Sequence, residues 1–252
     1  MSSKKIPLIL IAVAFFISAI CSCYFLFTVA EVDVDFAVSE RVDVNEIRSD
    51  FDSLLGKSVV FFDQKEVHEI MKNYPTLKLQ DSRIKSPNVL ALKIMERIPV
   101  YKLMMDGQVY LLDEEGVAVS IGQGDYKDRE LITLNVDGIS LAEEIVLGKK
   151  AKTDRDGVFY NALLMTKQVD LTDIIKEITV NYLSAGENRD VVFKTYTGVD
   201  ITITKADEYG LEKVKKAFDT YHENTNDYLK YMNRILVVML DSGEIRVTWT
   251  RS

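Results

Sequence analysis

The fold is decided by Ser86–Tyr101, which has the sequence Ser-Pro-Asn-Val-Leu-Ala-Leu-Lys-Ile-Met-Glu-Arg-Ile-Pro-Val-Tyr. Its opening Ser-Pro-Asn is typical of a turn, because proline fixes φ and asparagine tolerates a tight corner. Leu90, Leu92 and Ile94 then share one face at period two, which predicts a strand. Pro99 ends this strand, because proline has no N–H to give to a ladder.

The patterns before and after this stretch differ. The preceding residues alternate between helical and strand periodicity, whereas the following residues form short apolar runs separated by glycine turns. We therefore predict an α+β protein in which the stretch is both the last strand of a domain at 31–99 and the hinge into a domain at 100–252.

The predicted domain at 31–99 has two helices on a small mixed sheet. Asp43 and Asp63 are each followed three residues later by glutamate, a capping-box-like helix start. Strands are expected at Leu77–Lys85, with a bulge or bend where the alternation slips, and at Val89–Glu96. Ser58–Phe62 is a further short, apolar, β-rich segment.

The domain at 100–252 is predicted to be strand-rich and antiparallel, with flanking helices. Asp106-Gly107 is typical of a tight hairpin turn. A helix is expected from Asp207 to Asn224, with its apolar residues on one face. The chain closes with a hairpin whose strands are Arg234–Leu240 and Glu244–Trp249.

The N-terminus predicts a single membrane crossing. Residues Ile6–Ala30 carry no charge, and a run of that length can span a bilayer. Lys4 and Lys5 precede it, so residues 1–5 are expected to be a cytoplasmic tail and the bulk of the chain extracytoplasmic. A cleaved or lipoprotein signal is the alternative, but the run is longer than a usual signal core and lacks an Ala-x-Ala-like site. Lipidation of Cys21 or Cys23 stays open.

Composition and motifs argue against catalysis, metal binding and nucleic-acid binding. The formal net charge of −8 disfavours a nucleic-acid partner. Both cysteines lie in the first 30 residues, and the two histidines, His68 and His222, show no zinc-site spacing. Asp113-Glu114-Glu115 is interpreted as a solvated loop. We therefore predict no catalytic residue, cofactor or small-molecule substrate, although a glycosidase carboxylate pair is defined only in space and stays open.

Four motifs carry a resemblance to a known family. These are the segment Gly56-Lys57-Ser58-Val59-Val60-Phe61-Phe62-Asp63, then Tyr74-Pro75-Thr76-Leu77-Lys78, the Ser-Pro-Asn turn, and Glu96-Arg97-Ile98-Pro99. Together they resemble the POTRA domain of the FtsQ/DivIB family of bacterial cell-division proteins. The closing hairpin resembles the end of the family's β-domain. The tryptophans that the family usually carries in two of these motifs are absent here.

The resemblance implies a non-enzymatic, single-pass membrane protein of the divisome. Its expected partners are FtsB/DivIC-like and FtsL-like division proteins and the septal peptidoglycan synthesis machinery, and its expected location is the cell membrane at the division septum. Strand edges of the POTRA-like domain are expected to help recruitment. The alternative is a membrane-anchored extracytoplasmic enzyme or ligand sensor that uses a POTRA-like module.

The resemblance also implies a partner-binding site on the closing hairpin, where a strand of FtsB/DivIC adds to the sheet edge. The matching residues are Leu240, Asp241, Ser242, Gly243, Glu244, Ile245, Arg246, Val247, Thr248 and Trp249. An outward N–H is expected at Arg246 or Thr248. The alternative is that Trp249 only covers the domain core.

Overall fold

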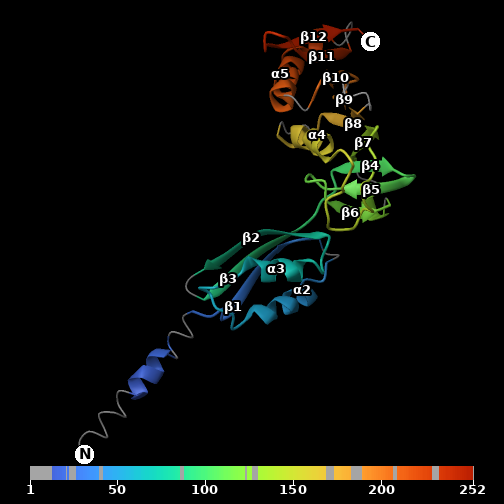
Figure 1. Cartoon of the computed structure of the whole chain (residues 1–252). Coiled ribbons are helices and arrows are strands. Elements are labelled where there is room, and N and C mark those ends of the chain that lie inside the picture. The colour runs from blue at the N-terminus through green and yellow to red at the C-terminus, as the bar shows by residue number, and fades with distance from the viewer. Residues whose placement is uncertain are drawn as a thin grey trace, which may run out of the picture. The chain divides into compact units, whose positions relative to one another are not determined.

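The computed structural model describes residues 13–20, 22, 27–39, 42–85, 88–122, 124–126, 130–168, 173–182, 189–206, 209–228 and 233–251. The chain divides into two compact units, Met1–Arg97 (unit 1) and Ile98–Ser252 (unit 2), each with helices and a sheet (Figure 1). The α+β class is therefore confirmed. Pro99, at which the sequence predicts the domain boundary, lies just inside unit 2.

The N-terminal apolar run is described only in part. Residues 13–20 are helical, whereas residues 6–12, 21 and 23–26 lie outside the described residues. Within the described ranges, no helix is long and apolar enough to cross a membrane. The crossing at Ile6–Ala30 stays a prediction.

Unit 1 has two helices and a small mixed sheet. Its elements are β1 (Glu31–Ala37), α2 (Val44–Phe51), the short 3₁₀ helix η1 (Asp52–Leu54), α3 (Gln64–Met71), β2 (Leu77–Lys85) and β3 (Val89–Glu96). Among the described residues the strand order is β1-β3-β2, with β1 parallel and β2 antiparallel to β3. A register shift between Leu79 and Asp81 confirms the predicted bulge. Ser58–Phe62 forms no regular strand, since only Ser58 makes a bridge, with Thr28.

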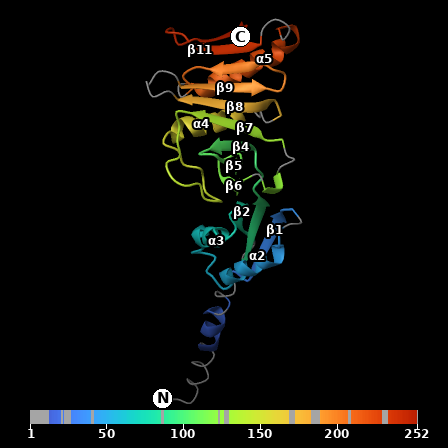
Figure 2. The ribbon, with the colours of Figure 1, turned by 90° about the vertical axis from the view of Figure 1, so that its right-hand side faces the viewer.

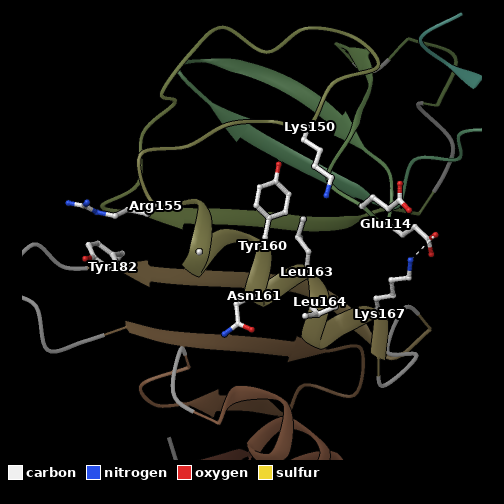
Figure 3. A pocket seen from close by; sticks show the side chains of 11 residues that line it. Glu114, Lys150, Arg155, Tyr160, Asn161, Leu163, Leu164, Lys167 and Tyr182 are labelled. Carbon is white, nitrogen blue, oxygen red and sulfur yellow. Dashed lines mark ion pairs between the residues drawn. The ribbon is translucent and has the colours of Figure 1, made fainter. Parts of the chain in front are cut away.

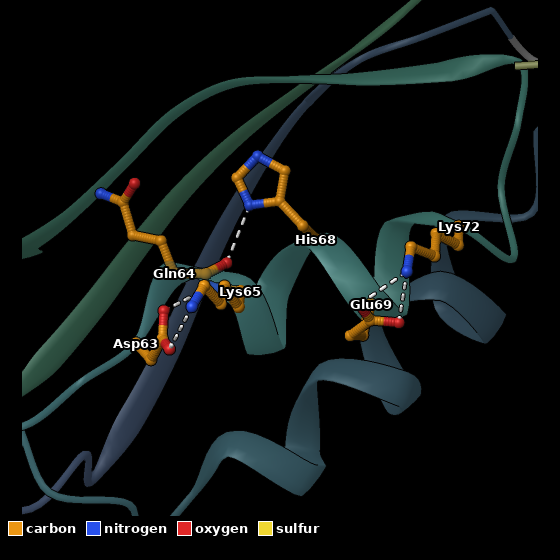
Figure 4. Close-up of polar contacts among 6 residues, drawn as sticks. All are labelled: Asp63, Gln64, Lys65, His68, Glu69 and Lys72. Atoms are coloured by element: carbon orange, nitrogen blue, oxygen red, sulfur yellow. Dashed lines mark hydrogen bonds and ion pairs between the residues drawn. The ribbon is translucent and has the colours of Figure 1, made fainter. Parts of the chain in front are cut away.

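Both helices of unit 1 begin at the predicted aspartates. The side chain of Asp43 accepts from the backbone N–H of Asn45 at 3.0 Å, which caps α2. Asp63 caps α3 in the same way, accepting from Lys65 N–H at 2.9 Å (Figure 4). Phe51 of α2 and Val67 of α3 are buried in the core of the unit, so each helix packs its apolar face against that core. The aspartate caps fix where the two helices begin.

Unit 2 contains a single large sheet of many strands among its described residues. Its elements are β4 (Tyr101–Met105), β5 (Gln108–Leu112), β6 (Ala118–Ile121), η2 (Gly124–Tyr126), β7 (Ile132–Asp137), α4 (Asp156–Gln168), β8 (Ile175–Tyr182), β9 (Arg189–Thr195), β10 (Asp200–Ile203), α5 (Gly210–Tyr228), β11 (Arg234–Met239) and β12 (Ile245–Thr250). In the part of the chain that the structure describes, nine strands follow the order β12-β11-β10-β9-β8-β7-β4-β5-β6 (Figure 2). The last strand of the chain therefore forms one end of the sheet.

The prediction of an antiparallel sheet in this unit is wrong in part, because three strand pairs are parallel. These pairs are β4–β7, β7–β8 and β10–β11. The chain passes through α4 between β7 and β8, and through α5 between β10 and β11, and such helical crossovers return the next strand in the same direction. The predicted helix at Asp207–Asn224 is observed as α5, which begins and ends a few residues later.

The two helices of unit 2 lie on the same face of the sheet (Figure 1). α4 packs against β8, and α5 packs against β10, β11 and β12. Phe159 of α4 and Phe218 of α5 are buried in one core with Phe193 of β9, whose ring lies 5.9 Å from that of Phe218. This continuous core fixes the position of the closing hairpin, because β11 and β12 contribute to it.

Candidate functional site

The closing hairpin forms as predicted, around a turn that depends on glycine. Gly243 has φ of 80°, a left-handed conformation that glycine adopts without steric strain. Its N–H donates to Leu240 O at 2.8 Å, and Leu240 N–H donates to Glu244 O at 2.9 Å. Asp241 and Ser242 are exposed at the turn. The hairpin therefore presents β12 in a fixed register against β11.

The side chains of β12 alternate between the core and solvent. Ile245, Val247 and Trp249 are partly buried and pack against the core of unit 2. Arg246 and Thr248 are exposed on the other face. Trp249 thus covers the core, as the alternative interpretation holds. Side-chain packing on one face does not determine whether the backbone N–H and C=O groups at the strand edge are paired.

The backbone of β12 directs every second residue away from β11. Leu240 pairs with Glu244 through a hydrogen bond, and the ladder alternates from there, so Arg246 and Thr248 direct their N–H and C=O groups at β11. The expectation of an outward N–H at Arg246 or Thr248 is therefore wrong. The outward groups belong to Ile245, Val247 and Trp249, and none of the described strands pairs with that side of β12.

A lysine of the neighbouring helix covers the first outward carbonyl. Lys216 of α5 donates from Nζ to Ile245 O at 2.6 Å, which agrees with the outward direction of that carbonyl. No sequence pattern indicates Lys216, because nothing in the helical periodicity distinguishes it from the exposed Lys215 beside it. Only the packing of α5 on β12 brings it to the edge.

At the opposite end of the same sheet, the chain pairs with the start of the edge strand. Beside β6, Ala118 N–H donates to Lys149 O at 3.0 Å, and Gly148 N–H donates to Ala118 O at 2.8 Å. Ala151 N–H donates to Gly116 O at 3.0 Å. Edges that are covered or paired do not accept another strand, whereas an uncovered edge does. Among the described strands, none pairs with the outer side of β12, whereas the start of β6 is paired with segment 148–151.

Strand β2 is one of the two outer strands of the small sheet in unit 1, the other being β1, and β2 has features that disfavour pairing with another chain. It carries the bulge after Leu79, and three cationic residues, Lys78, Arg83 and Lys85, lie along it, of which Arg83 pairs with Asp81 at 3.4 Å and Lys85 with Asp33 at 3.0 Å. Gln64 also donates from Nε2 to Ser82 O at 3.4 Å. Bulges and lysines are features by which natural edge strands avoid pairing with another chain.

The open face of the large sheet carries a charged network near its middle. Glu177 of β8 accepts from Lys194 Nζ at 2.6 Å and from Asn135 Nδ2 at 3.0 Å. The hydrogen bond from Lys194 holds the pKa of the Glu177 carboxyl below its usual value, and the same bond raises the pKa of Lys194. These groups satisfy one another, so the network is a structural feature of the face and not a reactive site.

A hollow of about 800 Å³ beside α4, the α4 hollow, is the second candidate site (Figure 3). Its lining combines acidic, basic, aromatic and aliphatic side chains. The lining residues are Glu114, Glu115, Lys150, Arg155, Gly157, Tyr160, Asn161, Leu163, Leu164, Lys167 and Tyr182.

The charged groups of the α4 hollow already have partners on the protein. Lys167 pairs with Glu114 at 3.1 Å. Lys150 lies over the ring of Tyr160, with its Nζ 5.3 Å from the centroid, and the Arg155 guanidinium lies 4.8 Å from the ring centroid of Tyr182. Among the lining residues that the structure describes, these charged groups are thus engaged in an ion pair or in contacts with aromatic rings.

The two histidines lie in different units. His68 lies in unit 1, where its Nδ1 is 2.8 Å from Gln64 O of its own helix (Figure 4). His222 lies on α5 of unit 2, next to the ring of Tyr221. Across the described ranges, no cluster of three or more histidine, cysteine, aspartate or glutamate residues has metal-binding geometry.

Comparison with known proteins finds a likeness among solved structures. No family model matches the chain, and no curated protein matches it. Among solved structures, the chain is similar to the major extracytoplasmic domain of the trans isomer of the cell-division protein DivIB from Geobacillus stearothermophilus. The identity is 10%, the TM-score is 0.30, and the match covers 52% of this chain and 97% of that chain.

Proposed function

We propose that the chain is a non-enzymatic, single-pass membrane protein of the bacterial divisome, which holds a strand of an FtsB/DivIC-like partner on the outer edge of β12. Residues 6–30 are its membrane anchor, and the units that follow are extracytoplasmic. Together with an FtsL-like protein, the complex assembles and regulates septal peptidoglycan synthesis at the division site.

The proposal is supported chiefly by the different hydrogen bonding at the two edges of the large sheet. Segment 148–151 is hydrogen-bonded to Gly116 and Ala118, where β6 begins, whereas β12 directs the backbone groups of Ile245 and Val247 outward, Lys216 donates to Ile245 O, and no described strand pairs with that edge. An added strand would gain main-chain hydrogen bonds from this edge, and its alternate side chains would meet Arg246 and Thr248 on the exposed face.

The motif resemblance supports the same function. The Glu96-Arg97-Ile98-Pro99 motif ends β3, the central strand of unit 1, and Gly56-Lys57 begins the connection that leads to α3. Unit 1 has the mixed sheet and two helices that a POTRA-like module requires. We propose that it assists recruitment to the septum and that the main FtsB/DivIC contact lies in unit 2.

The test replaces Val247, whose N–H points outward, with proline. Val247→Pro removes a donor from the edge without removing a β11–β12 hydrogen bond. We expect affinity for the purified extracytoplasmic domain of the FtsB/DivIC-like partner to fall about tenfold or more, which corresponds to about 1.4 kcal/mol. Isothermal titration calorimetry measures the affinity, and thermal unfolding reports whether the variant is folded.

Arg246→Pro is the matched control, because its N–H is used within the hairpin. This variant should unfold at a lower temperature than Val247→Pro, since it breaks the ladder itself. Val247 also packs on the core, so Val247→Pro could fail for lack of folding. A second experiment does not depend on that variant. Cysteines introduced at Thr248 and at successive positions of the partner strand should cross-link in one register. A folded Val247→Pro variant with unchanged affinity would refute the β12 site.

The α4 hollow is the feature that favours the alternative, a membrane-anchored ligand sensor. Its volume suits a small molecule, and Tyr160 and Tyr182 bring aromatic rings to its wall. A sensor would lose its response when the hollow is filled, for example by Leu164→Trp, whereas the divisome function would be unaffected. Leu164 is 42% exposed, so this change leaves the core in place.

A further inference from the structure

Two neighbouring hydrophobic side chains project from the connection between α2 and α3. The exposed fractions are 61% for Val60 and 87% for Phe61. The residues on either side, Val59 and Phe62, instead pack against the core of unit 1. Apolar side chains held out together from a folded surface are typical of a site that contacts a partner or a membrane.

Local hydrogen bonds on both sides hold the tip of this connection. Phe61 N–H donates to Ser58 Oγ at 3.4 Å, which closes the turn before the tip. After the tip, Asp63 caps α3 through Lys65 N–H at 2.9 Å (Figure 4). With these hydrogen bonds formed, the backbone already holds Phe61 exposed.

The same connection is hydrogen-bonded to the end of the N-terminal apolar run. Val59 N–H donates to Phe27 O at 2.8 Å, and Val29 N–H donates to Lys57 O at 2.8 Å. Thr28 and Ser58 form a bridge between these two pairs. The tip at Val60 and Phe61 thus lies next to the last residues of the uncharged run.

The length of that run places its end at the membrane surface. About 20 helical residues cross a hydrocarbon core of about 30 Å. If the proposed anchor starts at Ile6, about 20 residues bring it to the far side of the core near residue 25, and Phe27, which is 51% exposed, would then fall in the interface. Aromatic side chains favour that layer.

We propose that Val60 and Phe61 form a membrane-contact loop, which inserts into the boundary between the head groups and acyl chains of the leaflet from which unit 1 emerges. The inference rests on the proposed membrane anchor at residues 6–30. The nearby charges Lys57 and Glu66 pair with each other at 3.2 Å, so the contact buries no lone charge from this pair. Anchor and loop together give unit 1 two points of contact with the bilayer and hence a fixed orientation.

The test uses the full chain in vesicles of phosphatidylethanolamine and phosphatidylglycerol, with Cys21→Ser and Cys23→Ser as background. A nitroxide spin label is attached at Val60→Cys, which leaves Phe61 in place. The matched control is Asn73→Cys, an exposed position after the other end of α3. Collision with oxygen, which enters lipid, is compared with collision with a water-soluble nickel complex.

We expect the label at residue 60 to collide more with oxygen than with the nickel complex, and the label at residue 73 to show the reverse. Adding Phe61→Ser should shift the label at residue 60 toward the aqueous value. A residue-60 label that is as accessible to nickel as the control, in a chain that floats with the vesicles, would overturn the membrane-contact loop alone. A folded chain that does not float with vesicles would overturn the anchor and the loop together.

Discussion

The ammonium group of Lys216 lies 2.6 Å from the backbone carbonyl oxygen of Ile245, at the outer edge of the last strand. A partner strand that extends along β12 to this carbonyl must displace the lysine. Lys216 is exposed, so the bond forms where water competes with it. The bond is therefore weak enough to be exchanged for a main-chain hydrogen bond.

Lys216→Met should strengthen binding of the partner strand to β12. The methionine keeps the aliphatic part of the side chain but removes the donor that competes for Ile245 O. An exposed contact of this kind contributes about 0.2–1 kcal/mol, so we expect the affinity to rise by about 1.4- to fivefold. Calorimetric titration with the extracytoplasmic domain of the partner measures it.

Lys215→Met is the control for the loss of one positive charge, because Lys215 is the exposed neighbour on the same helix. It should leave the affinity unchanged. If both variants weaken binding equally, the lysines attract the partner by charge, and Lys216 does not compete for the edge.

Local patterns in the sequence predict most of the elements correctly. Asp43 and Asp63 mark the two helix starts of unit 1 because a capping side chain acts within a few residues. The antiparallel prediction for unit 2 fails because strand direction depends on which strands become neighbours. That choice is made by the packing of α4 and α5 on the sheet, over distances that local periodicity does not report.

For the β12 site, the sequence predicts which side chains face the core but not which backbone groups point outward. The period-two pattern of Ile245, Val247 and Trp249 correctly identifies the side chains that face the core. The direction of the backbone groups depends on the hairpin register, which the turn at Gly243 sets, and it is opposite to the expectation for Arg246 and Thr248. Lys216 reaches the edge from another element, so no sequence pattern around β12 indicates it.

The ion pair between Glu177 and Lys194 should make stability depend on pH at acid values. The pKa of Glu177 is lowered from its ordinary value of 4.5, chiefly by the hydrogen bond from Lys194. A lowered pKa in the folded state means that the stabilisation is present above the ordinary value and is lost as pH falls through the folded-state value. Glu177→Gln should therefore be less stable than the parent at pH 7, and this difference should shrink below about pH 4.5.

The size of this effect is limited by solvent, since the two side chains are 23% and 37% exposed. We expect about 1 kcal/mol or less in the free energy of unfolding at pH 7, measured by urea denaturation at several pH values. Glu144→Gln, at an exposed position, is the control and should show no such convergence. A gap between the parent and Glu177→Gln that stays constant down to pH 3 would contradict the assignment.

The buried lysine of α5 should be important for the stability of unit 2. Lys213 is fully buried, and its Nζ donates to Thr204 O at 2.8 Å and to Lys205 O at 3.1 Å. Lys213→Met keeps most of the volume but leaves these carbonyls without that donor. We expect the free energy of unfolding to fall by about 1–3 kcal/mol, measured by urea denaturation. Lys215→Met, on the surface of the same helix, should change it by less than about 0.5 kcal/mol, and equal effects of the two changes would contradict the prediction.

Alanine substitutions at Gly116 and Gly107 distinguish the cost of backbone strain from the cost of a steric clash. Both glycines have positive φ, 76° and 75°, so alanine is strained to a similar degree at either position. An added Cβ at Gly107 meets nothing within 4 Å, whereas at Gly116 it lies 2.6 Å from Tyr160 Cε1. The Tyr160 hydroxyl donates to Ala151 O, which restricts movement of the ring away from the clash.

Gly107→Ala should therefore lower the free energy of unfolding by about 1 kcal/mol, and Gly116→Ala by a further 1–3 kcal/mol or so, because overpacking is added to the same strain. Thermal and urea unfolding of the two variants measure the difference directly. Tyr160→Phe in the Gly116→Ala background frees the ring from Ala151 and should recover part of the loss. Equal destabilisation by the two alanines would show that the ring yields at no cost and that the wall of the α4 hollow at Tyr160 is not rigid.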